Sequence, residues 1–254
     1  VQTDFQELQE LDHGFDEMAR HISTLIETQR RDQEYLRRTE LELLQAQINP
    51  HFLYNTLDSI AILAENHREE DVVDMVTNLS SFFRNSLSKG KDLITLETEK
   101  KQVTSYLEIQ SVRYSDKLQY EIDIPDELLH VVVPKLILQP LVENALYHGI
   151  KNRRGMGTIA ITAETDGNDL LLRVKDSGAG MSAEQLETLK AGIYEERHTG
   201  LGLLNVHKRI RLYCGEPYGL DFESEPGKGT TVTVRLAMDL KTEEITPEVN
   251  TDAE

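Results

Sequence analysis

The sequence predicts two structural classes in one chain, helices in the N-terminal part followed by an α/β sandwich. Three observations support this prediction. Apolar residues near the N-terminus recur at steps of three and four, which is the pattern of a coiled-coil helix. The next stretch has the pattern of a helical hairpin with one apolar face on each arm. From about Lys117, short alternating strands are interleaved with helices, which indicates a mixed sheet covered by helices on one side.

The first predicted element is a coiled-coil helix within residues 1–30. Its apolar seam alternates steps of three and four, and charged residues fill much of the remainder. The seam residues are Leu8, Leu11, Phe15, Met18, Ile22 and Leu25. An amphipathic helix packed against its own domain is the alternative, but no nearby segment could cover it. We therefore expect two copies of this helix to pair.

Residues 31–115 are predicted to form a helical hairpin that serves as the dimerisation domain. Pro50 lies in its first arm and lacks the N–H that would bond to the carbonyl of Ala46, so a kink is expected there. The apolar stripe of this arm, predicted to be its core face, is Leu53, Leu57, Ile60 and Ala64. Because His51 lies about 200° around the helix from Leu53, its imidazole is expected to face solvent.

The second arm follows a polar turn at residues 65–70 and is expected to stop before Gly90, since glycine often follows the last helical residue. Its apolar face is Val72, Met75, Val76, Leu79, Phe82, Phe83 and Leu87. A hairpin with one apolar face per arm cannot bury itself alone, so two chains are expected to form a four-helix bundle. Another helix is expected from Thr95 to Arg113.

Residues 116–240 are predicted to form one α/β domain. Strands are expected near residues 118–124, 131–133, 159–163, 170–174, 220–224 and 231–236, and helices at 136–148, after Ser182 and at 203–213. A turn at residues 166–168, Asp-Gly-Asn, indicates a β-hairpin between two of these strands. Residues 241–254 are polar and acidic and are expected to be a disordered tail.

The composition excludes several function classes. The 27 basic residues against 45 acidic ones, a net charge of −18, argue against a nucleic-acid partner or an anionic membrane surface. No apolar run approaches the ~18 residues of a membrane span. Cys214 is the only cysteine, which excludes an intramolecular disulfide. The chain begins with Val1 instead of methionine, which indicates a fragment of a longer protein.

A histidine directly behind a proline stands out in the first arm of the hairpin. Residues 49–55 read Asn-Pro-His-Phe-Leu-Tyr-Asn. An exposed imidazole titrates near neutral pH and is a competent nucleophile, although most exposed histidines are only surface residues. This segment resembles, almost letter for letter, the phosphoacceptor box of the NPHF-type sensor histidine kinases, the LytS-like and YesM-like group. The resemblance implies that His51 receives the γ-phosphoryl group of ATP.

Three further segments follow in a fixed order. Residues 139–149 read Gln-Pro-Leu-Val-Glu-Asn-Ala-Leu-Tyr-His-Gly, residues 176–180 Asp-Ser-Gly-Ala-Gly, and residues 199–205 Thr-Gly-Leu-Gly-Leu-Leu-Asn. Each segment alone is a weak signal. All three in this order, followed by Gly229 and Thr230 before a strand, closely resemble the N, G1 and G2 boxes of the GHKL ATPase fold. The resemblance implies an α/β sandwich of the GHKL (Bergerat) type that binds ATP and Mg²⁺.

The residue types in these boxes suit a nucleotide. Asn144 offers a neutral carbonyl oxygen to Mg²⁺, and Asp176, at the end of a strand, can accept the exocyclic amine of adenine. The glycines of the second box allow the backbone to approach the base, and those of the third precede a helix N-terminus that suits phosphates. The nucleotide-binding residues implied by the resemblance are Asn144 (also the metal ligand), His148, Lys151, Asp176, Gly178, Gly180, Thr199, Gly200, Leu201, Gly202, Leu203 and Thr230.

The sequence departs from this pattern at two positions. Hydrolytic members of the fold carry a water-activating glutamate one turn before the asparagine; here that position is Pro140, and Glu143 points about 100° away from the asparagine along a helix. Loss of this base should leave ATP intact until His51 attacks. Many histidine kinases also place an acidic residue after the histidine, where this chain has Phe52. Asn55 and Glu143 are the candidates for orienting or deprotonating the histidine.

Together, the resemblances imply a sensor histidine kinase of a two-component system. Such an enzyme phosphorylates itself on His51 and passes the phosphoryl group to an aspartate of a response regulator. Residues 7–18 also resemble the second helix of a HAMP linker, which implies a homodimeric cytoplasmic part of a membrane sensor, joined to the membrane only through a missing N-terminal part. Two rivals stay open: a GHKL ATPase clamp that does not phosphorylate itself, and a dimeric scaffold with an inactive nucleotide site.

Overall fold

The computed structural model describes residues 50–86, 92–151, 153, 155–194 and 201–240. The chain divides into two units, Val1–Asn55 and Thr56–Glu254, and of the first unit only residues 50–55 are described. The predicted coiled-coil helix, the HAMP-like segment, the acidic tail and the segment leading up to Pro50 lie outside the described residues. None of the helices within the described ranges is long and apolar enough to cross a membrane.

Two helices form the start of the described chain, as the sequence predicted. They are α2 (Pro50–Glu65) and α3 (Glu69–Ser86). The connection between them falls within the predicted polar turn; His67 adopts a left-handed conformation with φ 54°, and the Asn66 side chain donates to the carbonyl oxygen of Ile62 at 2.7 Å. Phe82 of α3 packs on Tyr106 of the following helix, with ring centroids 6.1 Å apart.

The predicted core face of α2 is wrong by one residue position. The buried side chains of this helix are Phe52, Thr56 and Leu63, which are 4%, 2% and 6% exposed. Leu57 is 48% exposed and Ala64 is also exposed, although both belong to the predicted stripe. Apolar side chains extend around more of this helix than one chain covers, so the apolar pattern alone does not reveal which stripe is buried.

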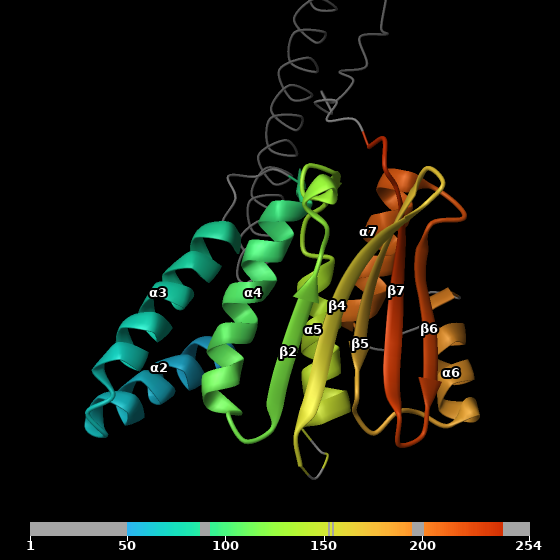
Figure 1. The fold of residues 1–254 in the computed structure, drawn as a ribbon. Coiled ribbons are helices and arrows are strands. Elements are labelled where there is room, and N and C mark those ends of the chain that lie inside the picture. Colours follow the sequence, from blue (N-terminus) through green and yellow to red (C-terminus); the bar gives the residue numbers. More distant parts are fainter. Residues whose placement is uncertain (1–49, 87–91, 152, 154, 195–200, 241–254) are drawn as a thin grey trace, which may run out of the picture. The chain divides into compact units, whose positions relative to one another are not determined.

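The α/β sandwich is confirmed. The five-stranded sheet has the order β2-β4-β5-β7-β6, in which β2 and β4 are parallel and the other pairs antiparallel. Its strands are β2 (Leu118–Asp123), β4 (Gly157–Asp166), β5 (Asp169–Asp176), β6 (Gly219–Glu225) and β7 (Gly229–Ala237). Helices α4 (Leu96–Arg113), α5 (Leu138–Asn144), α6 (Ala183–Tyr194) and α7 (Leu201–Cys214) accompany it. Figure 1 shows α5 and α7 behind the sheet.

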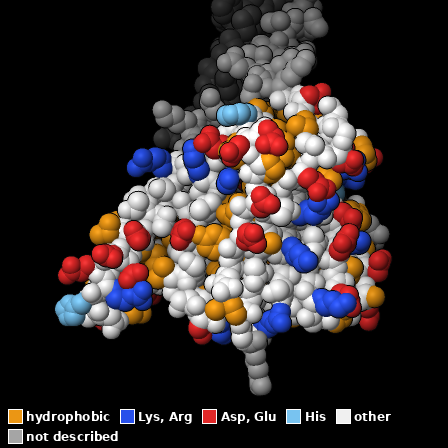
Figure 2. Space-filling view, in the orientation of Figure 1, with side chains coloured by type: hydrophobic (Ala, Val, Ile, Leu, Met, Phe, Trp, Pro, Cys, Tyr) orange, Lys and Arg blue, Asp and Glu red, His pale blue; other side chains and the backbone are white. Residues whose placement is uncertain are grey.

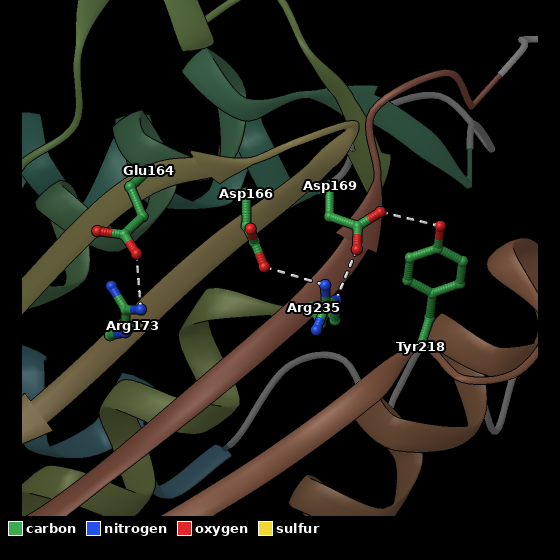
Figure 3. A network of polar contacts seen from close by, with 6 residues as sticks. All are labelled: Glu164, Asp166, Asp169, Arg173, Tyr218 and Arg235. Carbon is green, nitrogen blue, oxygen red and sulfur yellow. Dashed lines mark hydrogen bonds and ion pairs between the residues drawn. The ribbon is translucent and has the colours of Figure 1, made fainter.

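The two faces of the sheet differ in polarity, as strand alternation requires. The inner side chains of β4 and β5, such as Ile159, Ile161 and Leu172, are completely buried. On the other face, Arg235 of β7 bonds to Asp166 at 3.1 Å and to Asp169 at 2.6 Å (Figure 3). Acidic and basic side chains are interspersed over the face shown in Figure 2. The three glycine-containing boxes therefore lie on the helix-covered side of the sheet and at the strand ends, away from the charged outer face.

Two predicted elements differ in detail. The predicted strand near Val133 is β3 (Val132–Pro134), which pairs with β1 (Leu93–Thr95) in a separate two-stranded sheet. The single helix expected at 136–148 is instead α5 followed by a π-helix, η2 (Ala145–Ile150). Leu136, which was expected to be helical, has the left-handed φ of 60°.

Candidate functional site

Asp176 is the last residue of β5, and its side chain is buried at the end of the strand. It is 4% exposed, and Oδ1 accepts the backbone N–H of Gly178 at 2.7 Å. This is the local bond that Asp favours in a turn, so the sequence Asp-Ser-Gly ends the strand by itself. Burial raises the pKa of the Asp176 carboxyl above its ordinary value, and backbone N–H groups of Gly178 and Thr230 offset part of that rise.

Glycines surround this carboxylate. A Cβ atom on Gly149 would lie 2.5 Å from Oδ1 of Asp176. A Cβ on Gly178 would collide with the backbone of Gly149, and one on Gly229 with the carbonyl of Asp176. Only glycine permits such close approach of three backbone segments. We call Asp176 with Gly149, Gly178 and Gly229 the glycine cradle, because three glycines pack around one buried aspartate.

The loop after Asp176 is tied to the turn between β6 and β7. Gly227 donates its N–H to the carbonyl oxygen of Ala179 at 2.6 Å, and Met181 donates to Oγ of Ser224 at 2.9 Å. The Ser224 hydroxyl also lies 2.9 Å from that of Thr230. These bonds hold the second glycine-rich box against the start of β7. Thr230, which the sequence placed among the nucleotide-binding residues, thus lies beside the glycine cradle.

The first box reaches the glycine cradle through the π-helix. Asn144 ends α5 and is half-buried, and η2 then carries Gly149 to Asp176. A π-helix inserted at this point is a feature common at functional sites. His148 and Lys151 are exposed, and the Lys151 ammonium lies 5.3 Å from the centroid of the Tyr147 ring.

The third box lies beside the first. A Cβ on Gly202, near the N-terminus of α7, would lie 3.8 Å from Cβ of Pro140 on α5. Leu203 is 5% exposed, so it belongs to the core of the domain. Leu201 begins α7, whereas Thr199 and Gly200 lie outside the described residues. The structure therefore brings the described residues of all three boxes together, around Asp176 and α5.

Glu143 faces α4. Its Oε1 accepts a hydrogen bond from Nε2 of Gln139 at 2.8 Å, and Oε1 of Gln139 accepts one from Nε2 of Gln102 on α4 at 2.7 Å. Burial raises the pKa of the Glu143 carboxyl, and the bond from Gln139 offsets part of this. Its proposed role toward the histidine stays a prediction.

His51 and Asn55 both lie on the described start of α2, in the first unit. The His51 side chain is exposed, as the helical phase predicted, and Asn55 is half-buried. Sequence reasoning gave Gly149 no role beyond its place at the end of the first box, directly after the predicted helix. It gave no role to Glu99 or Arg209, whose contacts are described below. No local signal could have found these residues, because their partners are distant in the sequence.

Comparison with known proteins agrees with this geometry. Residues 39–118 match the family described as histidine kinase, and residues 133–240 match the histidine kinase-, DNA gyrase B- and HSP90-like ATPases. Sensor histidine kinase YesM of Bacillus subtilis is 38% identical over 226 residues, which are 89% of this chain and 38% of that protein. The chain belongs to the sensor histidine kinases of the YesM and LytS type.

Other members of this kinase family are similarly related. Sensor histidine kinase BtsS of Escherichia coli is 36% identical over 208 residues, and sensor protein LytS of Staphylococcus haemolyticus is 34% identical over 203 residues. These matches cover 81% and 79% of this chain, but only 35% and 34% of the relatives. The chain thus spans little more than a third of these kinases. The catalytic domain of histidine kinase ThkA is 22% identical, with a TM-score of 0.45 over 57% of this chain and 94% of that chain.

Proposed function

We propose that this chain binds ATP, transfers its γ-phosphoryl group to His51 and passes that group to an aspartate of a response regulator. The observation that supports this best is the glycine cradle, a buried carboxylate against which three glycines pack, in a domain of an ATPase family. The same chain carries an exposed histidine in the box that resembles the kinase phosphoacceptor.

The glycine cradle suits a purine. The exocyclic amine of adenine would donate to the Asp176 carboxylate, which is desolvated and therefore selective for a matching donor. The missing Cβ atoms of Gly149, Gly178 and Gly229 let these backbone segments close directly around Asp176, so a base bonded to its carboxylate would meet backbone atoms. Specificity for ATP over GTP follows, since guanine presents a carbonyl oxygen where adenine presents its amine.

The phosphates would lie toward α5 and α7. The first N–H groups of α7 have no partner within the helix and suit phosphates, and its Gly202 adjoins the helix that ends in Asn144. The side-chain oxygen of Asn144 is a neutral hard ligand and would hold Mg²⁺, which would supply charge neutralisation on the phosphates.

The transfer itself is a substitution at phosphorus. A ring nitrogen of His51 forms the N–P bond while the bond from phosphorus to the leaving oxygen of ADP breaks, and the ring proton goes to solvent or to a neighbouring base. The active chain would be a homodimer, the cytoplasmic part of a membrane sensor. Pro140 replaces the water-activating glutamate of hydrolytic relatives, which favours histidine over water as the acceptor.

Labelling with γ-³²P-ATP and Mg²⁺ tests the proposal. We expect an acid-labile, alkali-stable label on the full chain that His51→Gln abolishes. Variants His67→Gln and His130→Gln, which change exposed histidines elsewhere, are the matched controls and should label normally. Phosphate release without label would identify the ATPase clamp, and binding without either reaction the inactive scaffold; both outcomes would overturn the proposal.

A further inference from the structure

Glu99 is a buried carboxylate on α4 that serves another helix. It is 1% exposed, and it accepts the backbone N–H groups of Leu136 at 2.6 Å, Ile137 at 3.1 Å and Leu138 at 3.0 Å. Leu138 is the first residue of α5, whose N-cap residue Ile137 makes no side-chain cap of its own. The first N–H groups of a helix have no partner within it. Glu99 therefore caps α5 from outside.

Arg209 on α7 holds the same segment from the other side. Its Nη1 donates to the carbonyl oxygens of Lys135 and Leu136. Leu136 occupies the left-handed region at φ 60°, a conformation that persists only where its surroundings enforce it. The donors of this segment are thus bound by α4 and its acceptors by α7. Burial raises the pKa of Glu99, while the three N–H groups and Arg209 offset part of that rise.

The contact between α4 and the segment before α5 is reciprocal. The backbone N–H groups of Leu96 and Glu97, at the start of α4, donate to the carbonyl oxygens of Val131 and Leu129 at 2.9 Å each. One turn further along, the bond between Gln102 and Gln139 continues the interface to Glu143. The start of α4 is therefore bonded to the segment that precedes α5, and the start of α5 is bonded to Glu99 of α4. A movement of one helix should consequently displace the other.

This interface joins the two family segments. Helix α4 lies within residues 39–118, which match the histidine kinase family, and packs on α3 through Tyr106. Helix α5 lies within residues 133–240, which match the ATPase family, and ends at Asn144. Asn144 follows the capped Leu138 by six residues, about 9 Å along one short helix. A displacement of α4 would thus be transmitted to Asn144.

We infer that Glu99 is a positioning residue for phosphoryl transfer: by capping α5 it sets Asn144 relative to α4 and α3, and so links the hairpin side of the chain to the nucleotide site. This inference rests on the proposed function. Glu99 does not belong to the glycine cradle, so it should affect the productive placement of the phosphates more than the binding of the base.

Glu99→Gln in the full chain tests this role. The amide keeps the size of the side chain, but it loses the charge and turns an N–H₂ group toward backbone donors. We expect the single-turnover autophosphorylation rate at saturating ATP to fall by roughly tenfold to a hundredfold, because a misplacement of about 1 Å can cost that much. The Mg²⁺ concentration for half-maximal rate should rise, while the Kd for ADP without Mg²⁺ should change less than about threefold.

The matched control is Glu97→Gln. Glu97 lies two residues away on the same helix, but its carboxylate is exposed and pairs with Lys101 at 2.6 Å. Its rate, Mg²⁺ dependence and Kd for ADP should equal those of the unmodified chain. An unchanged rate and Mg²⁺ dependence in Glu99→Gln would overturn the inference, as would an equal loss in both variants.

Arg209→Gln provides a second route to the same answer. It releases the carbonyl side of the segment while Glu99 stays in place, and should show the same loss of rate with retained affinity for ADP. If Glu99→Gln does not fold, an unchanged rate in Arg209→Gln overturns the inference. Failure of the proposed function is distinguishable, because the unmodified chain would then take up no label at all.

Discussion

The helical hairpin and the α/β domain differ in how completely one chain buries them. Helices α2 and α3 leave large apolar side chains between 45% and 67% exposed: Tyr54, Leu57, Ile62, Val73 and Val76. The inner face of the sheet, by contrast, is closed, and Ile159, Leu172 and Val234 are completely buried. Exposed apolar groups gathered on two neighbouring helices indicate an interaction surface. Nucleotide binding is therefore expected to be a property of one chain, and the hairpin to need a second surface.

Helix α4 belongs to both regions. It packs on α3 through Tyr106 and caps α5 through Glu99. Whether the α/β domain can fold without the hairpin consequently depends on the region to which α4 belongs. The predicted domain boundary between residues 115 and 116 assigns it to the hairpin and stays a prediction. The buried contacts of α4 with α5 predict instead that α4 belongs to the α/β domain, and this can be tested by removing it.

The largest effect is expected from removing α4. A chain of residues 92–240 should fold as a monomer and bind ADP, whereas residues 117–240 should not fold cooperatively. Leu96, Val103 and Leu107 of α4 are completely buried, and each leucine-sized side chain is worth roughly 1.5–3 kcal/mol. Their loss together with the cap from Glu99 approaches the total stability of a domain, about 5–15 kcal/mol. Circular dichroism melting and calorimetry decide; a cooperative melt with normal affinity in residues 117–240 would assign α4 to the hairpin.

The next effect concerns the glycine cradle. Gly149→Ala would place Cβ 2.5 Å from Oδ1 of Asp176, so the carboxylate has to move. We expect affinity for ADP to fall by about 100-fold, on the order of 3 kcal/mol, as for other overpacked buried sites. Gly227→Ala is the control: its φ is 78°, but no atom lies within 4 Å of the added Cβ. It should cost about 1 kcal/mol in stability and leave affinity unchanged. Equal affinities for the two variants would exclude the cradle as the nucleotide site.

The exposed face of the hairpin can be tested in a chain that begins at residue 50, so that the heptad helix does not contribute. Val76→Lys with Leu57→Lys should convert a dimer to a monomer in sedimentation, because two apolar side chains that the dimer would bury are lost, at roughly 1.5–3 kcal/mol each. Affinity for ADP should stay the same. Thr77→Lys adds one lysine at an exposed polar position of α3, next to Val76, and should leave the dimer intact. If the chain from residue 50 is a monomer, or if the double lysine variant still dimerises, this face of the hairpin is not a dimer interface.

The smallest effect is a pH dependence at the interface between α4 and α5. Burial raises the pKa of Glu143, so the folded state favours the protonated carboxyl, and stability is lost as the pH rises through that raised pKa. Glu143→Gln cannot ionise. Relative to the unmodified chain, its free energy of unfolding should therefore increase as the pH rises above the ordinary pKa of a glutamate. Glu187→Gln, at an exposed position of α6, serves as the control and should show no such trend. If the difference in free energy of unfolding between the two chains does not change with pH, the folded state does not disfavour the ionised Glu143 carboxylate.

Much of the fold and the site is determined by local sequence. The helix from residue 96 to residue 113, the strands of the sheet and the turn at residues 166–168 follow from periodicity and turn residues. The three boxes were recognisable because their glycines and polar residues recur at fixed spacing. Their spatial convergence could be expected only from the resemblance, since no spacing within one box brings it to another.

The tertiary structure decided the features that depend on distant partners. It placed Leu63 in the core and left Leu57 exposed, because burial depends on which neighbour covers a helix with a wide apolar surface. It brought Gly149, the last residue of the first box, against Asp176 of the second box. It also placed Glu99 as the cap of a helix that begins 39 residues later in the chain. Sequence periodicity reports contacts within a few residues, whereas a buried carboxylate is stabilised by whichever backbone donors the finished fold brings to it.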